Sequence, residues 1–173
     1  MEEIRNQKTG QTIRFFSDRG DATSQVLKME ASYPPGSKEP PIHYHPYQQE
    51  RFEVLSGELT LRLNGEIKRY QKGSVIHIEK GAKHSMWNSG RENTLVNWQV
   101  TPALESGQFL RAITEAANGP GASDKGIPGP AEMIYLLNRY RNVIRLVKPS
   151  YPLTRIVGIL LLPLLRFKTR LSI

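Results

Sequence analysis

The feature that most constrains the fold is a series of short apolar runs between residues 11 and 101. These runs are rich in Val, Ile, Leu, Phe and Trp, and Gly, Pro and Asn residues separate them. Such spacing is typical of a β-sandwich or β-barrel. The clearest segment is 59–67, where apolar and polar residues alternate and Asn64-Gly65 supplies the pair that a type I′ turn favours. It predicts a hairpin that buries one face, made of Leu59, Leu61 and Leu63.

A second alternating segment, residues 95–100, ends the β-rich region. One of its faces would carry Val96, Trp98 and Val100, and the other Leu95, Asn97 and Gln99. The first face is the more apolar, so we predict that it is buried.

Helical signals follow the β-rich region. Thr101 suits an N-cap and Pro102 the first helical position, so a helix is predicted from there to Ala117, ending at Asn118-Gly119. Residues 118–130 include Gly-Pro-Gly and Pro-Gly-Pro, which are typical of an irregular linker.

Two further helices are predicted after the linker. The apolar stripe of the first contains Met133, Leu136, Leu137, Tyr140, Ile144 and Val147. Beyond Pro149 and Pro152 the stripe of the second, with a kink at Pro163, contains Leu153, Ile156, Val157, Leu160, Leu161, Leu164 and Leu165. The chain is therefore predicted to divide into a β-barrel with its following helix (1–117), a linker (118–130) and a helical C-terminal segment (131–173).

The formal net charge of +8 is confined to the C-terminal segment. Residues 133–173 contain no Asp or Glu and eight basic residues: Arg139, Arg141, Arg145, Lys148, Arg155, Arg166, Lys168 and Arg170. In one interpretation both stripes pack on the barrel or on a partner, with the cations in solvent. In another, residues 153–170 contact a membrane surface, as basic amphipathic helices can. Nucleic-acid binding is not expected, because no helix-turn-helix or aromatic stacking platform is apparent.

Cysteine is absent, which excludes disulfides, thiolate metal ligands and cysteine nucleophiles. The first residues are acidic and lack an apolar core, unlike a signal peptide. The longest apolar run, residues 156–165, contains Pro163 and is much shorter than the roughly twenty residues of a membrane span. These observations favour a cytoplasmic protein, with a peripheral membrane location as the alternative.

All four histidines lie between residues 43 and 84. His43 and His45 are two residues apart, so on a β-strand both imidazoles project from one face. Glu50 follows shortly, and His84 comes from a later strand. Three imidazoles and a carboxylate suit one divalent transition metal (Fe, Mn, Ni, Co, Cu or Zn) and leave positions open for water, substrate or O₂. The histidine pair alone would more often be ordinary surface or core residues.

Two groups of residues resemble the paired motifs of the cupin superfamily. The first consists of Gly36, His43, His45, Glu50 and Gly57, with one extra residue before the histidine pair. The second consists of Gly73, Glu79, Gly81, His84 and Asn88, with Glu79 where the family usually has Pro. Residues 50–59 are similar to those of single-domain bacterial cupins of the conserved-barrel type (cupin type 2).

The resemblance covers roughly residues 10–102. It implies a mainly β fold, a double-stranded β-helix or jelly-roll barrel, followed here by C-terminal α-helices. It also implies that His43, His45, Glu50 and His84 ligate one metal ion inside one end of the barrel, and that the protein forms a homodimer.

Five further residues are candidates for lining a pocket beside the metal: His77, Met86, Asn88, Trp98 and Phe52. Met86 and Asn88 have the strand parity of His84, and Phe52 has that of Glu50. Ordinary packing is the alternative role for each of the five.

Two functions remain open. The first is a small metalloenzyme with oxygenase- or isomerase-like chemistry on a small organic molecule, the metal acting as a Lewis acid or, if iron, activating O₂. The second is a non-catalytic module that binds or senses a small ligand and is docked to a membrane surface or partner by its basic helices. The complete ligand set favours the first, and the scarcity of other acid–base groups favours the second.

Overall fold

Two antiparallel sheets form the larger part of the molecule in the computed structural model, which describes residues 2–16 and 25–169, the last nine of them by backbone only. The six-stranded sheet has the order β1-β2-β3-β10-β5-β8. Its strands in that order are Glu2–Arg5, Thr12–Phe15, Leu27–Tyr33, Thr94–Thr101, Gln49–Ser56 and Val75–Ile78.

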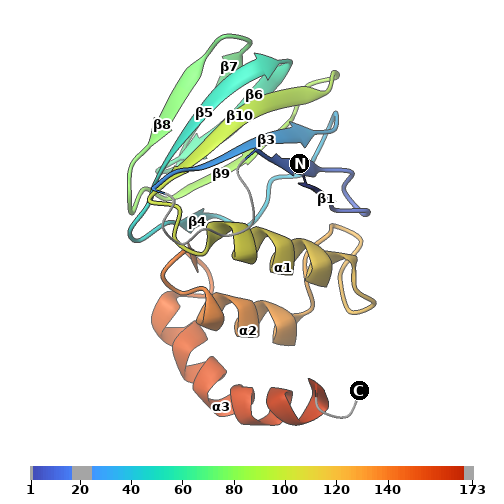
Figure 1. Ribbon diagram of the computed structural model, residues 1–173, viewed down its shortest axis with the longest axis vertical. Coiled ribbons are helices and arrows are strands. Elements are labelled where there is room, and N and C mark those ends of the chain that lie inside the picture. The colour runs from blue at the N-terminus through green and yellow to red at the C-terminus, as the bar shows by residue number, and fades with distance from the viewer. Residues whose placement is uncertain (1, 17–24, 170–173) are drawn as a thin grey trace.

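The second sheet has five strands in the order β11-β4-β9-β6-β7. These strands are, in that order, Arg145–Leu146, His43–Tyr44, His84–Trp87, Glu58–Leu63 and Glu66–Gln71. The two sheets together make the barrel in the upper half of Figure 1. The expected mainly β fold, a double-stranded β-helix followed by helices, is confirmed.

The core lies between the two sheets and follows from the alternation of the strands. In β5, Phe52 and Val54 are buried, and their neighbours in the sequence are less so. The predicted hairpin is β6 and β7, in which Asn64 and Gly65 have φ angles of 50° and 99°, as a type I′ turn requires. Predicted core residues of β6 and β10 belong to this core as buried or partly buried members: Leu59, Leu61, Leu63, Val96, Trp98 and Val100.

Gly57 is the residue at which the chain passes from β5 in one sheet to β6 in the other. Its φ angle is 73°, and a Cβ atom there would lie 2.6 Å from the Asn93 carbonyl oxygen. Both the conformation and the close approach of the backbone require glycine. This requirement explains the last glycine of the first motif.

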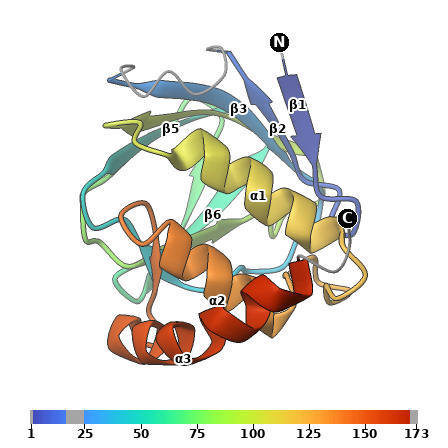
Figure 2. The ribbon, with the colours of Figure 1, turned by 60° about the horizontal axis from the view of Figure 1, so that its bottom comes forward.

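Helices α1 (Ser106–Asn118), α2 (Pro130–Arg139) and α3 (Tyr151–Thr169) lie beyond one end of the barrel. Figure 2 shows α1 across that end, with α2 and α3 further out. The predicted end of α1 at Asn118 is confirmed, but its predicted start at Thr101 is wrong. Thr101 is the last residue of β10 and pairs with Gln49, so sheet pairing continues past the residue that resembled an N-cap.

The second predicted helix is wrong beyond Arg139. Helix α2 ends there, and Arg145 and Leu146 form β11, which pairs with Tyr44 and His43 at the edge of the five-stranded sheet. Buried residues of α2 and of the turn after it pack on α1. This helical cluster contains Phe109, Leu137, Val143 and Ile144, of which Leu137 and Ile144 belong to the predicted stripe. The edge pairing explains why the helix does not continue, since β11 completes hydrogen bonds that β4 would otherwise lack.

Helix α3 packs on α2 with its small and polar residues. Thr154 and Gly158 are buried, and any side chain at 158 would collide with the Asn138 amide. The residues predicted to form a packed stripe point outward instead: Leu153, Ile156 and Leu160 are 51%, 58% and 68% exposed. The expectation was that this stripe packs on the barrel or on a partner; these three residues do not pack on the barrel, and packing on a partner stays a prediction.

Helix α3 continues through Pro163 to Thr169, and its ribbon changes direction along its length (Figure 1). Five of the predicted residues lie outside the described side chains, namely Leu161, Leu164, Leu165, Arg166 and Lys168, and Arg170 lies outside the described residues. Among the described residues, no helix is both long and apolar enough to cross a membrane.

Candidate metal centre

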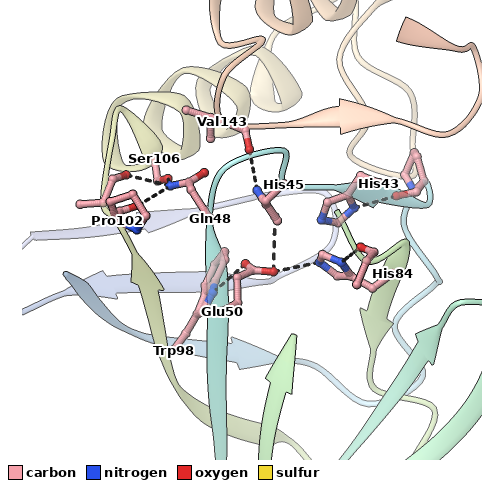
Figure 3. A network of polar contacts seen from close by, with 12 residues as sticks. His43, His45, Gln48, Glu50, His84, Trp98, Pro102, Ser106 and Val143 are labelled. Carbon is pink, nitrogen blue, oxygen red and sulfur yellow. Dashed lines mark hydrogen bonds and ion pairs between the residues drawn. The ribbon is translucent and has the colours of Figure 1, made fainter. Parts of the chain in front are cut away.

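Three strands from the two sheets place the predicted ligands at the end of the barrel that faces the helices. His43 lies on β4 and is the direct cross-strand partner of His84 on β9, while Glu50 comes from β5 of the other sheet. His45 follows β4 immediately. Figure 3 shows the four side chains converging on one point. The structure thus brings together every residue of the predicted ligand set.

The three imidazoles form a tight group. Their ring centroids lie 4.4 Å (His43–His84), 5.3 Å (His43–His45) and 5.4 Å (His45–His84) apart. One nitrogen from each ring lies within 4.8 Å of the other two. Nitrogen ligands about 2.1 Å from a tetrahedrally coordinated ion lie about 3.4 Å apart, so side-chain movements of about 1 Å would bring the three nitrogens to shared coordination.

Each imidazole is oriented by a backbone carbonyl. The Nδ1 atoms of His43, His45 and His84 lie 3.0, 2.6 and 3.0 Å from the carbonyl oxygens of Pro41, Val143 and Ala82. A carbonyl oxygen can only accept, so in each neutral ring Nδ1 carries the proton. The Nε2 lone pairs are then free for a metal, an arrangement that is usual for histidine ligands.

Glu50 supplies the negative charge of the group. Trp98 Nε1 donates to Glu50 Oε1 at 3.0 Å, and Glu50 Oε2 lies 2.9 Å from His84 Nε2 and 3.4 Å from His45 Nε2. Glu50 Oε2, His84 Nε2 and His45 Nε2 are all buried and have no hydrogen-bond partner. Buried polar atoms without partners are rare because they are costly, and a shared cation would satisfy all three. The residues present therefore fit a divalent metal ion.

The charge states also suit a metal. Burial, together with the charges of His84 and His45, lowers the pKa of His43 to about 3, so this ring is neutral at pH 7. Burial alone would raise the pKa of Glu50, but attraction to the three imidazoles outweighs it and lowers the pKa to about 2. For His84 burial acts to lower the pKa, and the Glu50 carboxylate raises it above its usual value. The carboxylate thus favours a positive charge at this point, whether proton or metal ion.

Among the predicted pocket residues, Trp98 is the one that contacts the ligand set. It stacks on Phe52 with ring centroids 5.5 Å apart and donates to Glu50, so it fixes the orientation of the carboxylate. Phe52 itself and Met86 belong to the barrel core. For Phe52 and Met86, core packing was the alternative to lining a pocket, and the structure shows this packing.

Two of the predicted pocket residues lie elsewhere. The Asn88 amide donates to the carbonyls of Tyr33 and Glu92 and accepts from Gly90 N–H, so it holds a turn rather than facing a pocket. His77 is exposed on β8, whose buried face carries Ile76 and Ile78. A pocket-lining role for His77 is therefore wrong, because the strand parity turns it away from the barrel interior.

The sequence analysis missed Gln48, which is only 1% exposed. Its Nε2 donates to Ser106 Oγ at 2.7 Å and to the Pro102 and Ala103 carbonyls at 2.8 and 3.0 Å, so its orientation is unambiguous. Its Oε1 atom is buried and has no partner. Figure 3 shows this side chain with its contacts to Pro102 and Ser106. Gln48 has the strand parity of Glu50, a signal that could have identified it.

Comparisons with known proteins agree with this geometry. The family model described as "Cupin domain" matches residues 29–99, which contain both motifs and all four predicted ligands. A crystal structure from Thermotoga maritima, of a predicted oxalate decarboxylase, is similar with a TM-score of 0.51 and 21% identity, covering 58% of this chain and 90% of that one. The family model thus assigns residues 29–99 of the chain, the greater part of the barrel, to the cupin superfamily.

Two curated relatives are similar in part of their length. The tetracenomycin polyketide synthase protein TcmJ of Streptomyces glaucescens is 26% identical over 87 residues, which is 50% of this chain and 58% of that protein. An oxidoreductase of Arthrobotrys oligospora is 33% identical over 75 residues, 42% of this chain and 29% of that protein. The similarity thus spans half of this chain or less, and less than two thirds of either relative.

Proposed function

We propose that this chain is a metal-dependent cupin that binds one divalent transition metal through His43, His45, Glu50 and His84. The observation that carries this proposal is the group of three buried, partnerless ligand atoms, His45 Nε2, His84 Nε2 and Glu50 Oε2, within 3.4 Å of one another in two of the three pairs. The bound metal would be Fe, Mn, Ni, Co, Cu or Zn, since imidazole and carboxylate ligands suit all of these.

The same proposal makes the protein a small metalloenzyme that acts on a small organic molecule. A bound metal would supply Lewis-acid chemistry or, if iron, activation of O₂. The curated relatives carry different descriptions, a polyketide synthase protein and an oxidoreductase, so the reaction, oxygenase- or isomerase-like, stays unassigned.

Other residues of the site have roles in this proposal that do not involve metal ligation. Trp98 holds the Glu50 carboxylate in one orientation through its Nε1 donor. Gln48 holds the start of β5 to the residues before α1 and to its first residue through its amide nitrogen.

The test is metal analysis of chelator-stripped protein after reloading with each candidate ion. We expect one ion per chain for the preferred metal, and loss of binding in the double variant His43→Ala, His84→Ala. The chain offers a matched control in His77→Ala, which removes an exposed histidine outside the site and should bind like the wild type. Failure of the wild-type protein to bind any of the six metals would refute the proposal.

The exposed apolar residues of α3 favour a second candidate function. It is a non-catalytic cupin that binds or senses a small ligand and docks to an anionic membrane surface through α3. Four large apolar residues of this helix are more than half exposed, namely Leu153, Ile156, Ile159 and Leu160. They lie in a segment with eight basic and no acidic residues, which matches the charge of anionic lipid headgroups.

Vesicle co-sedimentation separates the possible partners of this surface. Binding to phosphatidylserine vesicles, absent with phosphatidylcholine vesicles and lost in Ile156→Glu, would support membrane docking. The control Ile67→Glu changes a similarly exposed isoleucine on β7 and should bind normally. The wild type could instead bind neither kind of vesicle and have twice the chain mass in solution. If Ile156→Glu then makes it monomeric, the surface is the interface of the homodimer that the resemblance implies.

A further inference from the structure

Between α2 and α3 the chain returns to the barrel, and the residues of this stretch contact the predicted metal ligands. Val143 lies directly beside His45 in Figure 3, and its carbonyl oxygen is 2.6 Å from His45 Nδ1. Three residues later, Leu146 is the strand partner of His43. The Val147 N–H then donates to the Ile42 carbonyl at 2.9 Å. Residues 143–147, here called the brace, thus contact both histidines of the pair from about a hundred residues away in the sequence.

The brace is anchored on its other side to the helices. Val143 and Ile144 are buried with Phe109 of α1 and Leu137 of α2. Arg145 lies over the Tyr151 ring at 3.9 Å, at the first residue of α3, and within 6.0 Å of the Tyr47 ring in the loop after His45. The same few residues therefore connect all three helices to the loop that carries the histidine pair.

The histidine pair depends on these contacts. Strand β4 has two residues, and β11 is its neighbour on one side while β9 lies on the other. If the brace moved away, His43 would lie on a two-residue edge strand. The His45 Nδ1 proton would lose the acceptor that the structure gives it, and the ring could then rotate or change tautomer.

We infer that the brace is a positioning element of the metal centre, so that metal affinity and docking of the C-terminal helices onto the barrel are coupled. This inference rests on the proposed metal-binding function and assigns a role to a segment outside the family motifs. Coupling of this kind is reciprocal: docked helices raise metal affinity, and bound metal stabilises docking by the same factor.

The main test uses Val147→Pro in the full-length chain. Proline removes the N–H that bonds to the Ile42 carbonyl, and because this N–H is paired, the substitution should loosen the brace from β4. The loosened brace would withdraw the Val143 carbonyl from His45 Nδ1. We therefore expect Co²⁺ and Zn²⁺ affinity, measured by competition with a chromophoric chelator, to fall about 10- to 100-fold, the usual effect when a histidine ligand loses its outer hydrogen-bond partner. The visible spectrum of the Co²⁺ form should also change, because it reports coordination geometry. Val147→Ala keeps the N–H and should lose much less affinity.

A second pair of variants guards against a general loss of stability. Leu137→Ala loosens the helical cluster without touching a histidine, and Leu59→Ala removes the same atoms from the barrel core. The coupling requires that Leu137→Ala lower metal affinity more than Leu59→Ala does. It also requires that metal slow amide hydrogen exchange in α2 and β11 of the wild type.

The outcomes distinguish the two proposals. Wild-type metal affinity and spectrum in both Val147→Pro and Leu137→Ala would overturn the inference and leave the metal centre intact. An amide hydrogen exchange rate in α2 and β11 that is the same with and without metal would overturn the inference as well. Failure of the wild type itself to bind metal would instead overturn the proposed function on which the inference rests.

Discussion

The barrel and the outermost helix, α3, bury their large apolar residues to very different degrees. In the barrel, Phe52 and Met29 are fully buried, and alternation along each strand supplies such residues from both sheets. In the outermost helix, Ile156 and Leu160 are 58% and 68% exposed, while small and polar residues face α2. Burial of a large apolar side chain stabilises a fold by about 1.5–3 kcal/mol, so the barrel accounts for stability and the outer face of α3 does not. The contrast implies that α3 is kept apolar for something other than folding.

The largest expected effect tests the barrel side of this contrast. Phe52→Ala removes a fully buried ring that stacks on Trp98, and should reduce the free energy of unfolding by about 3–5 kcal/mol, measured by urea denaturation. Ile67→Ala, at a 52% exposed position of the same barrel, should change it by no more than about 0.5 kcal/mol. Similar losses in the two variants would mean that the barrel core is not the main source of stability.

The next effect concerns the junction between the barrel and α1. Gln48→Met keeps most of the side-chain volume but leaves the Pro102 and Ala103 carbonyls and Ser106 without their donor. Such buried unsatisfied groups cost about 1–3 kcal/mol, which urea denaturation would detect. The neighbouring Gln49 is exposed, so Gln49→Met is the matched control and should be neutral. If Gln48→Met were equally neutral, the polar contacts between β5 and α1 would contribute nothing to stability.

The barrel and its ligand set could be predicted from the sequence because both depend on local, periodic signals. The parity of strand residues placed Leu59, Leu61 and Val96 in the core, and the two-residue spacing of His43 and His45 brought both rings to one place. His77 was a pocket candidate without such an argument, and it belongs to the outward face of β8. Strand parity predicts which residues share a face of a strand. Which of the two faces is buried depends on how the strand packs against the other sheet.

The junction with the helices could not be predicted because its signals are non-local. Thr101 and Pro102 form a good helix start by local rules, yet pairing with Gln49 keeps Thr101 in β10. The carbonyl of Val143 bonds to His45 across 98 positions of sequence, and no side-chain pattern marks a backbone acceptor. The apolar stripe of α3 was recognised, but a stripe does not reveal whether it is covered.

A smaller effect tests the contact between α2 and α3. Asn138 is buried, and its Nδ2 donates to the Thr154 carbonyl and to the Ile134 carbonyl, both at 2.9 Å. Asn138→Ala should cost about 1 kcal/mol and speed amide exchange in α3 while leaving exchange in the barrel unchanged. Asn93→Ala, which removes an exposed hydrogen bond to Ser32 of the barrel, is the control and should not affect α3. Faster exchange in the barrel strands as well would show that the two regions unfold as one unit.

The smallest expected effect is the most informative about α3. Ile159 is 60% exposed, so Ile159→Ser should change the free energy of unfolding by no more than about 0.5 kcal/mol in urea denaturation of dilute, vesicle-free protein. The same substitution should weaken whatever α3 binds, because it removes apolar area from that surface. A destabilisation of about 2 kcal/mol would instead mean that the residue is buried in solution, as in a homodimer. Repeating the measurement over a range of protein concentrations separates these cases, since only the stability of a dimer rises with concentration.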